Sequence, residues 1–200
     1  YYYCQYNLGN VALMAPLSAI GTVGMVVGAI LFTLLAKYIG KKNCMFGIAI
    51  IYAATNIVLY FIGWGNYALL CVCAAITTTT SGAAIVCVNA MMADTIEYGE
   101  WKTGQRNEAM ITSTRCFVTK CVAALAALAV VAAIGMTGMN PEAAVQAPAV
   151  LNGFHLLYTL VNACVMILAV IPMFFYKLTE KRHAEIMEEL AARKASKDNN

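Results

Sequence analysis

The stretch Ala93-Asp94-Thr95-Ile96-Glu97-Tyr98-Gly99-Glu100-Trp101-Lys102-Thr103-Gly104-Gln105-Arg106 decides how the rest of the chain is arranged. It carries five charged side chains in a chain that is 62% hydrophobic and 12% charged. Long apolar runs flank it at 68–92 and 110–134. Because hydrocarbon offers no partners to charged groups, a charged segment between two runs of bilayer length must lie at the membrane surface. We expect it to form a loop there.

The composition places the chain among integral membrane proteins. Its mean hydropathy is +0.71, and its charged share is about half of the roughly 25% that is typical of soluble domains. Apolar runs of about 20 residues recur, which is the length needed to cross a hydrocarbon core of about 30 Å. The eight cysteines lie mostly inside these runs, without convincing zinc or redox spacing, and we expect them to act as small apolar side chains.

The predicted fold is an all-α polytopic membrane bundle over residues 1–176, followed by a cytoplasmic tail over 177–200 that contains a short surface helix at 184–194. The chain begins without an initiator Met or a signal peptide, and we expect it to be a piece of a longer protein. Residues 1–8 are too short to span a membrane. Five complete spans follow, at about 13–36, 44–62, 68–92, 108–134 and 153–176.

The distribution of basic residues predicts the orientation. The loops around Gly9, Trp64 and Pro141 hold no Lys or Arg, so we expect them on the external side, with His155 near that interface. By the positive-inside rule the other side and the C-terminus are cytoplasmic, in a cell's inner membrane. Of 13 basic residues, 11 fall on this side: Lys37, Lys41, Lys42, Lys102, Arg106, Lys177, Lys181, Arg182, Arg193, Lys194 and Lys197.

The two remaining basic residues, Arg115 and Lys120, lie inside the fourth span. Lys120 is about 20 Å along that helix at a rise of 1.5 Å per residue, close to the bilayer middle. A charge there costs about 2.5–3.5 kcal/mol, so it needs a carboxylate, a water-filled cavity or a substrate. Arg115 either snorkels to the cytoplasmic surface or shares that role. Cys116 and Thr119 lie one turn from Lys120 and Arg115 respectively, on adjoining sectors of the helix.

An unusual run of hydroxyl residues, Thr77 to Ser81, lies near mid-depth in the third span. Such hydroxyls either bond back to their own helix, which bends or packs it, or face a cavity. Both interpretations stay open at this point. The candidates for lining a cavity in this span are Thr77, Thr80, Ser81 and Asn89.

Three motifs carry a resemblance to a known family. They are Ala-Asp-x-x-Glu-Tyr-Gly-Glu-Trp-Lys-Thr-Gly-x-Arg at 93–106 with Glu108 after it, Val118-Thr119-Lys120, and the tail at 178–186. The chain resembles the glycoside–pentoside–hexuronide:cation symporters, the melibiose-carrier branch of the major facilitator superfamily. The resemblance covers essentially all 200 residues. It implies the C-terminal half of a twelve-helix transporter, from the end of helix 7 to helix 12, with a central site between two rocking halves.

The resemblance also implies roles for individual residues. Lys120 matches a helix-11 lysine that contributes to sugar recognition and coupling, and Arg115, Cys116 and Thr119 fall on positions that line the sugar site. Arg115 stands where melibiose carriers have an amide, Cys116 where they have a hydroxyl residue, and Ile85 where they have an aromatic. Because Arg binds carboxylates bidentately, this basic pair suits an acidic sugar such as a hexuronide.

The remaining expected partners are a monovalent cation, the N-terminal half and the lipid bilayer. The coupling cation, Na⁺ or H⁺, is expected to bind mainly to acidic residues of the N-terminal half, and this chain is expected to need no other cofactor and no nucleic acid. The charged segment is interpreted as a cytoplasmic gate that pairs with basic groups of the other half. The alternative is a solvated anchor with surface pairs worth about 0–1 kcal/mol each. The gate residues are Asp94, Glu97, Tyr98, Glu100, Lys102 and Arg106.

The expected function is therefore cation-coupled sugar symport by alternating access. An enzyme is not expected, because the sequence has no HExxH motif, no GxSxG motif and no paired intramembrane carboxylates. Two alternatives keep the transporter fold but change the function: a non-sugar cargo, or a sensory or assembly role without transport. Measured uptake separates them.

Overall fold

The computed structural model describes residues 3–136, 146–176 and 178–198, and these are helical with short connections. Two predicted features, the loop around Pro141 and the basic residue Lys177, lie outside the described residues. No strand occurs in the part of the chain that is described. The α-helices are α1 (Met14–Ile39), α2 (Lys41–Ile62), α3 (Tyr67–Thr103), α4 (Glu108–Met136), α5 (Pro148–Tyr158), α6 (Leu160–Val170) and α7 (Glu180–Asp198).

Five segments are long and apolar enough to cross a membrane, which confirms the predicted all-α membrane fold. Short helices of other types extend or precede them: η1 (Tyr3–Asn7), η2 (Val11–Leu13) and η3 (Ile171–Phe175). The span bounds differ from the predicted ones by a few residues at most ends, with one larger difference in the third. The observed segments are Val11–Ile39, Lys41–Ile62, Tyr67–Thr103, Glu108–Met136 and Pro148–Phe175.

Helix α3 continues through the segment that we expected to be a loop. It begins after Asn66, whose side chain accepts a hydrogen bond from the Leu69 N–H, and it runs 37 residues, or about 55 Å. The helix outlasts the apolar run because no proline interrupts 93–103. It ends where Gly104 adopts φ 74° and its N–H bonds the Glu100 carbonyl at 2.8 Å. The charged residues 94–102 therefore lie on a helix that extends beyond the hydrocarbon core.

Close contact between α1 and α3 depends on glycine. A Cβ atom at Gly28 would lie 1.8 Å from the Thr79 carbonyl oxygen, and one at Gly82 would lie 2.2 Å from the Met25 carbonyl oxygen. Neither position can hold a larger residue at the observed spacing. Small residues at such contacts let membrane helices approach closely, where packing replaces the hydrophobic effect as the source of stability.

The last membrane segment contains a local break. Residues 153–176 were predicted as one span and Pro148–Phe175 forms one candidate span, but within it α5 ends at Tyr158 and α6 begins at Leu160. Thr159 lies between them with φ −112° and ψ −79°, and its fully buried hydroxyl donates to the His155 carbonyl at 2.6 Å. A serine or threonine that bonds back to the preceding turn commonly bends a helix. The tail helix is also longer than the predicted 184–194, since α7 covers Glu180–Asp198.

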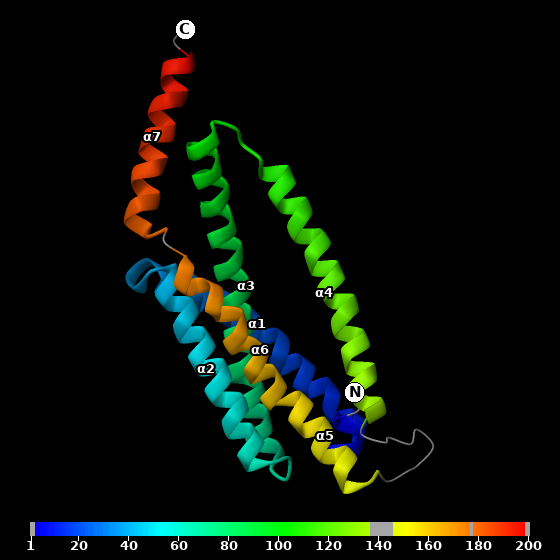
Figure 1. Cartoon of the computed structure of the whole chain (residues 1–200). Helices are drawn as coiled ribbons and strands as arrows, with labels where there is room; N and C mark the ends of the chain where they lie inside the picture. Colours follow the sequence, from blue (N-terminus) through cyan, green and yellow to red (C-terminus); the bar gives the residue numbers. More distant parts are fainter. Residues whose placement is uncertain (1–2, 137–145, 177, 199–200) are drawn as a thin grey trace.

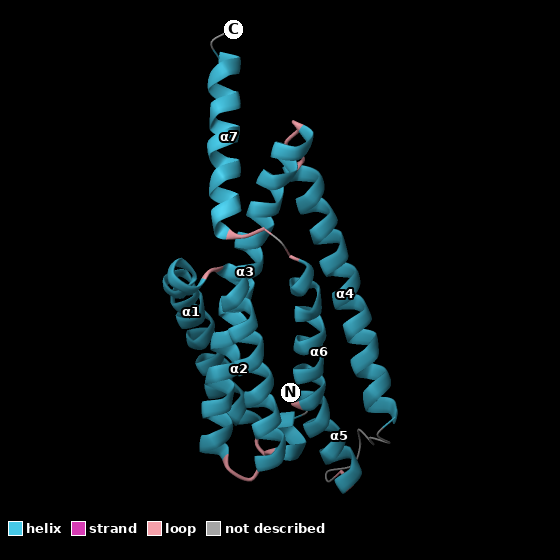
Figure 2. Ribbon diagram, turned by 60° about the vertical axis from the view of Figure 1, so that its left-hand side comes forward, coloured by secondary structure: helices cyan, strands magenta, loops and turns pink. Residues whose placement is uncertain are grey.

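The helices form a bundle from which α4 stands apart (Figures 1 and 2). Helix α2 packs against α3 and α6, and α1 packs against α3. None of the most apolar window of α4 is buried. Helix α7 projects from the end of the bundle where the α3–α4 connection lies (Figure 1). All eight cysteines are free; Cys4, Cys44, Cys73 and Cys87 are buried, and three others are exposed.

Candidate functional site

An ion pair between α2 and α3 lies where the charged segment begins. Lys41 is the first residue of α2, and its Nζ lies 2.7 and 2.6 Å from the two carboxylate oxygens of Asp94 on α3. The Asp94 side chain is only 9% exposed, against 24% for Lys41. A charge-assisted contact to both oxygens, sheltered from water, is among the stronger polar interactions in proteins. It joins α2 and α3 through two residues that are 53 positions apart in the sequence.

Helix α7 adds a histidine to this pair. His183 Nε2 lies 3.6 Å from Asp94 Oδ1 and is hydrogen-bonded to the Glu97 carboxylate. The ligand atoms of Asp94, Glu97 and His183 lie within 4.8 Å of one another, close enough to hold a metal ion. However, Lys41 already contacts both oxygens of Asp94. A positive charge in that place disfavours a second cation, so the arrangement supports an ion-pair network better than a metal centre.

A second set of contacts fixes α7 against the end of α3. Trp101 donates from Nε1 to Glu189 Oε2 at 2.6 Å, and its carbonyl accepts from Arg193 at 2.9 Å. The Arg182 guanidinium lies 5.1 Å from the centre of the same indole ring, which is cation–π geometry. Ile186 of α7 is fully buried. The tail is therefore a docked helix rather than a free extension.

Most of the other residues of the predicted gate have partners nearby in the chain. Arg106 contacts Glu100 at 3.2 Å and Glu108 at 2.9 Å, and these contacts raise the pKa of Arg106 above its ordinary value. The ring of Tyr98 packs against Trp101, with centres 5.8 Å apart, and Lys102 is exposed. Acidic side chains that we expected to pair with another half of the protein thus have partners within this chain. Pairing across two halves stays a prediction.

Tyr176 lies beside the ion-pair network, just after the last membrane segment. Burial, together with the carboxylates of Asp94 and Glu180, raises the pKa of Tyr176 to about 12. Its hydroxyl is buried and has no hydrogen-bond partner among the described residues. Glu180 itself accepts from the Lys41 backbone N–H at 2.6 Å. That contact satisfies one of the free N–H groups at the start of α2 and places a negative charge at the positive end of the helix.

The substrate candidates on α4 meet α3 at one point. Arg115 Nη1 donates to Asn89 Oδ1 at 2.6 Å and lies 3.3 Å from the sulfur of Met92. The structure thus brings together two residues that were singled out separately in the sequence. Thr119 donates to the Arg115 carbonyl, and Cys116, Thr119 and Lys120 are all exposed. No acidic side chain of the described residues pairs with Lys120.

The hydroxyl groups of the run Thr77 to Ser81 donate hydrogen bonds to backbone carbonyls of α3 itself. Thr77 donates to the carbonyls of Cys73 and Ala74, Thr80 donates to those of Ile76 and Thr77, and Ser81 donates to Thr77. These bonds run to residues three or four positions earlier, which is the back-bonding pattern of hydroxyl residues in helices. The hydroxyl hydrogens are therefore already used within the helix.

A buried histidine lies at the opposite end of the bundle. We expected His155 at the membrane interface, but it is only 3% exposed. Its Nε2 lies 3.2 Å from the Tyr60 carbonyl and its Nδ1 lies 3.1 Å from the Tyr3 hydroxyl. Because a carbonyl only accepts, Nε2 carries the proton and the Tyr3 hydroxyl donates to Nδ1. Burial raises the pKa of Tyr3, so this donor stays protonated. Tyr3 is 152 residues away, so no local pattern indicated the contact.

Known proteins similar to this chain are transporters. The family described as MFS/sugar transport protein matches residues 1–180. A protein of Escherichia coli (strain K12) that is provisionally named a sulfoquinovose importer is 33% identical over 195 residues, covering 96% of this chain and 41% of its own length. The glucuronide carrier protein homolog of the same organism is 30% identical over 194 residues, with 96% and 42% covered.

A third relative, the lactose permease of Lactobacillus delbrueckii subsp. bulgaricus, is 31% identical over 194 residues, which is 94% of this chain and 30% of that protein. The chain thus spans about two fifths of the length of the first two relatives, and less of the third.

Proposed function

Because this chain belongs to the MFS/sugar transport family, we propose that it is the C-terminal half of a cation-coupled sugar symporter that works by alternating access. The predicted family resemblance is confirmed by this match. Its five apolar spans and its two-fifths share of its relatives' length support the assignment to one half of such a transporter. Transport by the complete protein needs both halves, since the two halves of this superfamily rock about a site between them.

The proposed substrate is a sugar that carries an acidic group. The observation that supports it best is the contact between Arg115 and Asn89 at 2.6 Å. A guanidinium has five N–H donors, and the bond to Asn89 uses one Nη1 hydrogen, which leaves Nη2 and Nε for a bidentate contact with an acid. Two relatives are named for sulfoquinovose and for glucuronides. Both are sugars with an acid group, a sulfonate in one and a carboxylate in the other.

Lys120 is the second proposed binding group. It lies five residues beyond Arg115 on α4 and is exposed there, so its ammonium is available to a ligand or to a carboxylate of the other half. Placing it at mid-depth costs about 2.5–3.5 kcal/mol, and a functional contact would offset that cost. The coupling ion is proposed to be Na⁺ or H⁺, bound mainly by acidic groups outside this chain.

The proposed location is the inner membrane, with the C-terminus in the cytoplasm. The argument is the positive-inside rule: the start of α2, the α3–α4 connection and the docked helix α7 all lie at one end of the bundle (Figure 1), and all three carry basic residues. The charged segment at that end, with Asp94 buried against Lys41, is the proposed cytoplasmic gate.

Uptake measurements test this proposal. Membrane vesicles that hold the complete transporter are given labelled hexuronides, a sulfonated hexose, pentosides and neutral glycosides, with and without imposed Na⁺ or pH gradients. The parent is compared with Arg115→Gln and Lys120→Ala. Lys181→Gln, at an exposed position of α7, is the matched loss of one positive charge. We expect gradient-driven uptake of the acidic sugars, abolished in Lys120→Ala.

The substitution at Arg115 tests the substrate class. A hydrogen bond to a charged group is worth about 1.5–3 kcal/mol, so Arg115→Gln should raise the KM for acidic sugars by about 10-fold to 150-fold. It should leave the KM for neutral glycosides unchanged. Uptake of neutral glycosides alone, unaffected by Arg115→Gln, would refute the acidic-sugar proposal. No uptake of any sugar under any gradient would favour a non-sugar cargo or a role without transport.

A further inference from the structure

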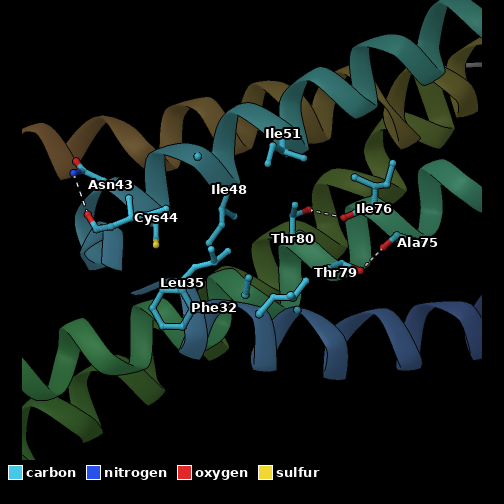
Figure 3. Close-up of a pocket in the computed structure, with 15 residues that line it drawn as sticks. Phe32, Leu35, Asn43, Cys44, Ile48, Ile51, Ala75, Ile76, Thr79 and Thr80 are labelled. Atoms are coloured by element: carbon cyan, nitrogen blue, oxygen red, sulfur yellow. Dashed lines mark hydrogen bonds between the residues drawn. The ribbon is translucent and has the colours of Figure 1, made fainter. Parts of the chain in front are cut away.

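An apolar groove runs along the outside of the bundle between α1 and α2. Its volume is about 580 Å³, and residues of α3 form its floor (Figure 3). Leu31 and Leu35 of α1 form one wall, and Ile48 and Ile51 of α2 form the other. It is separate from the contact between Arg115 and Asn89, neither of which lines it. A volume of this size is typical of sites for small molecules, which range from about 300 to 1,000 Å³.

The groove exists because α1 and α2 both pack on α3 but leave space between them. Gly28 fixes α1 against α3, since a Cβ there would overlap the Thr79 carbonyl. On the α2 side Gly47 lines the groove, and a Cβ at Gly47 would meet nothing within 4 Å. The absence of a side chain at Gly47 thus keeps the groove open. Unlike Gly28, Gly47 does not lie at a close contact between two helices.

The chemistry of the floor excludes a sugar and favours hydrocarbon. Thr79 and Thr80 lie on the floor, but Thr79 donates to the Ala75 carbonyl at 2.7 Å and Thr80 to the Ile76 carbonyl at 2.9 Å (Figure 3). The methyl groups of the two threonines are therefore what the floor presents to a ligand. The exposed wall residues are large and apolar; Leu35 is 47% and Ile51 is 51% exposed. A polar ligand would lose its water here and gain few hydrogen bonds in return.

The length of the groove matches one leaflet of a membrane. On α1 it extends from Gly28 to Ile39, which is about 16 Å at 1.5 Å per residue. Half of a hydrocarbon core of about 30 Å is about 15 Å. The groove ends at Ile39 and Asn43, beside the start of α2. Lys41 is already paired with Asp94, whereas Lys42 donates to the uncharged Tyr176 carbonyl at 2.7 Å, and no acidic side chain of the described residues pairs with it. A basic residue at the surface end of a site between membrane helices attracts the phosphate groups of lipids.

We propose that this groove binds one acyl chain of a phospholipid from the leaflet next to Lys42, with its phosphate at the Lys42–Asn43 end. That leaflet is the cytoplasmic one in the orientation proposed above. The site is independent of the sugar, because its lining includes none of the proposed substrate residues on α4. A bound acyl chain would also fill the gap between α1 and α2, so it would contribute to the packing of the bundle.

Native mass spectrometry of the complete transporter, purified in mild detergent, tests the site. Gly47→Trp places an indole in the groove, and Gly135→Trp on α4 is the matched control, since a Cβ at Gly135 also meets nothing within 4 Å. We expect the parent and Gly135→Trp to retain one phospholipid, and Gly47→Trp to retain at least tenfold less. Equal retention in all three proteins would overturn the proposal.

A labelling experiment on the unsubstituted protein covers the case in which Gly47→Trp fails to fold. The protein is reconstituted in vesicles that contain a phospholipid with a diazirine near the end of one acyl chain, and adducts are mapped after irradiation. We expect adducts concentrated on the groove walls at 28–51 and on its floor at 75–83. Adducts spread evenly over the outer faces of the helices would indicate bulk lipid and overturn the proposal. So would their absence from the groove, as expected if another part of the protein or a second copy covers it.

Discussion

Removing the carboxylate of Asp94 should destabilise the bundle far more than removing an exposed carboxylate of the same segment. Two unit charges 2.6 Å apart, the observed Lys41–Asp94 distance, attract by about 6 kcal/mol at an effective dielectric constant of 20. Desolvation of both groups offsets much of that attraction. Breaking a fully buried pair by removing one partner costs about 3–5 kcal/mol.

The partial exposure of Lys41 reduces the expected cost of breaking this ion pair. Asp94 is 9% exposed, but Lys41 keeps 24% of its surface in contact with solvent, so water can take up part of the unpaired charge. We therefore expect Asp94→Asn to cost about 2–3 kcal/mol. For a folding unit of about 200 residues this lowers Tm by about 4–12 °C. Glu108→Gln, which breaks an exposed contact to Arg106, should lower Tm by no more than about 2 °C.

Thermal unfolding of the purified protein in detergent measures both shifts. A double-mutant cycle with Lys41→Met and Asp94→Leu then isolates the pair, and we expect a coupling energy of at least about 1 kcal/mol. If Asp94→Asn and Glu108→Gln shift Tm equally, or if the two substitutions of the cycle are additive, the ion pair does not hold α2 to α3 and the reasoning fails.

Four further substitutions, one of them a control, test other contacts. Gly28→Leu should prevent α1 from packing on α3 and abolish the folded protein, while Gly47→Leu, which faces open space, should leave the yield of folded protein unchanged in size-exclusion chromatography. His155→Phe removes two hydrogen bonds of a buried side chain and should cost about 1–3 kcal/mol in thermal unfolding; a Tm equal to that of the parent would contradict the buried site. Glu189→Gln weakens the bond from Trp101 and should speed proteolytic removal of α7 several-fold, and unchanged cleavage would show that this bond does not hold the helix.

The number and type of the membrane helices could be predicted because they depend on composition over long windows. An apolar run of about 20 residues has few alternatives to a membrane helix, since every backbone polar group must bond within the segment. Helix ends were harder to predict. The apolar run of α3 stops near Met92, but its hydrogen bonding continues to Thr103. Gly104, which takes the left-handed conformation after the last helical residue, was the available signal, although Gly99 offers the same signal five residues earlier inside the helix.

The candidate site was predictable only as separate residues. Arg115 drew attention because a charge is costly inside a span, and Asn89 because it is polar. Their contact joins residues 26 positions apart on two helices, and no periodic pattern encodes it. The same holds for Lys41 with Asp94 and for His155 with Tyr3, which are 53 and 152 residues apart. Such pairs depend on how helices are placed side by side, which tertiary packing decides.

Helix α3 connects the features that carry the proposed functions. Thr79 lies on the floor of the groove, Asn89 contacts Arg115, and Asp94 contacts Lys41. These three residues lie within about 23 Å on one helix without a break. Since Asn89 and Asp94 are separated by little more than one turn, a tilt of α3 that separates Asp94 from Lys41 also moves the Asn89 oxygen away from the guanidinium that it positions. The proposed gate and the proposed substrate arginine are therefore joined by one unbroken helix, which is the kind of connection that alternating access requires.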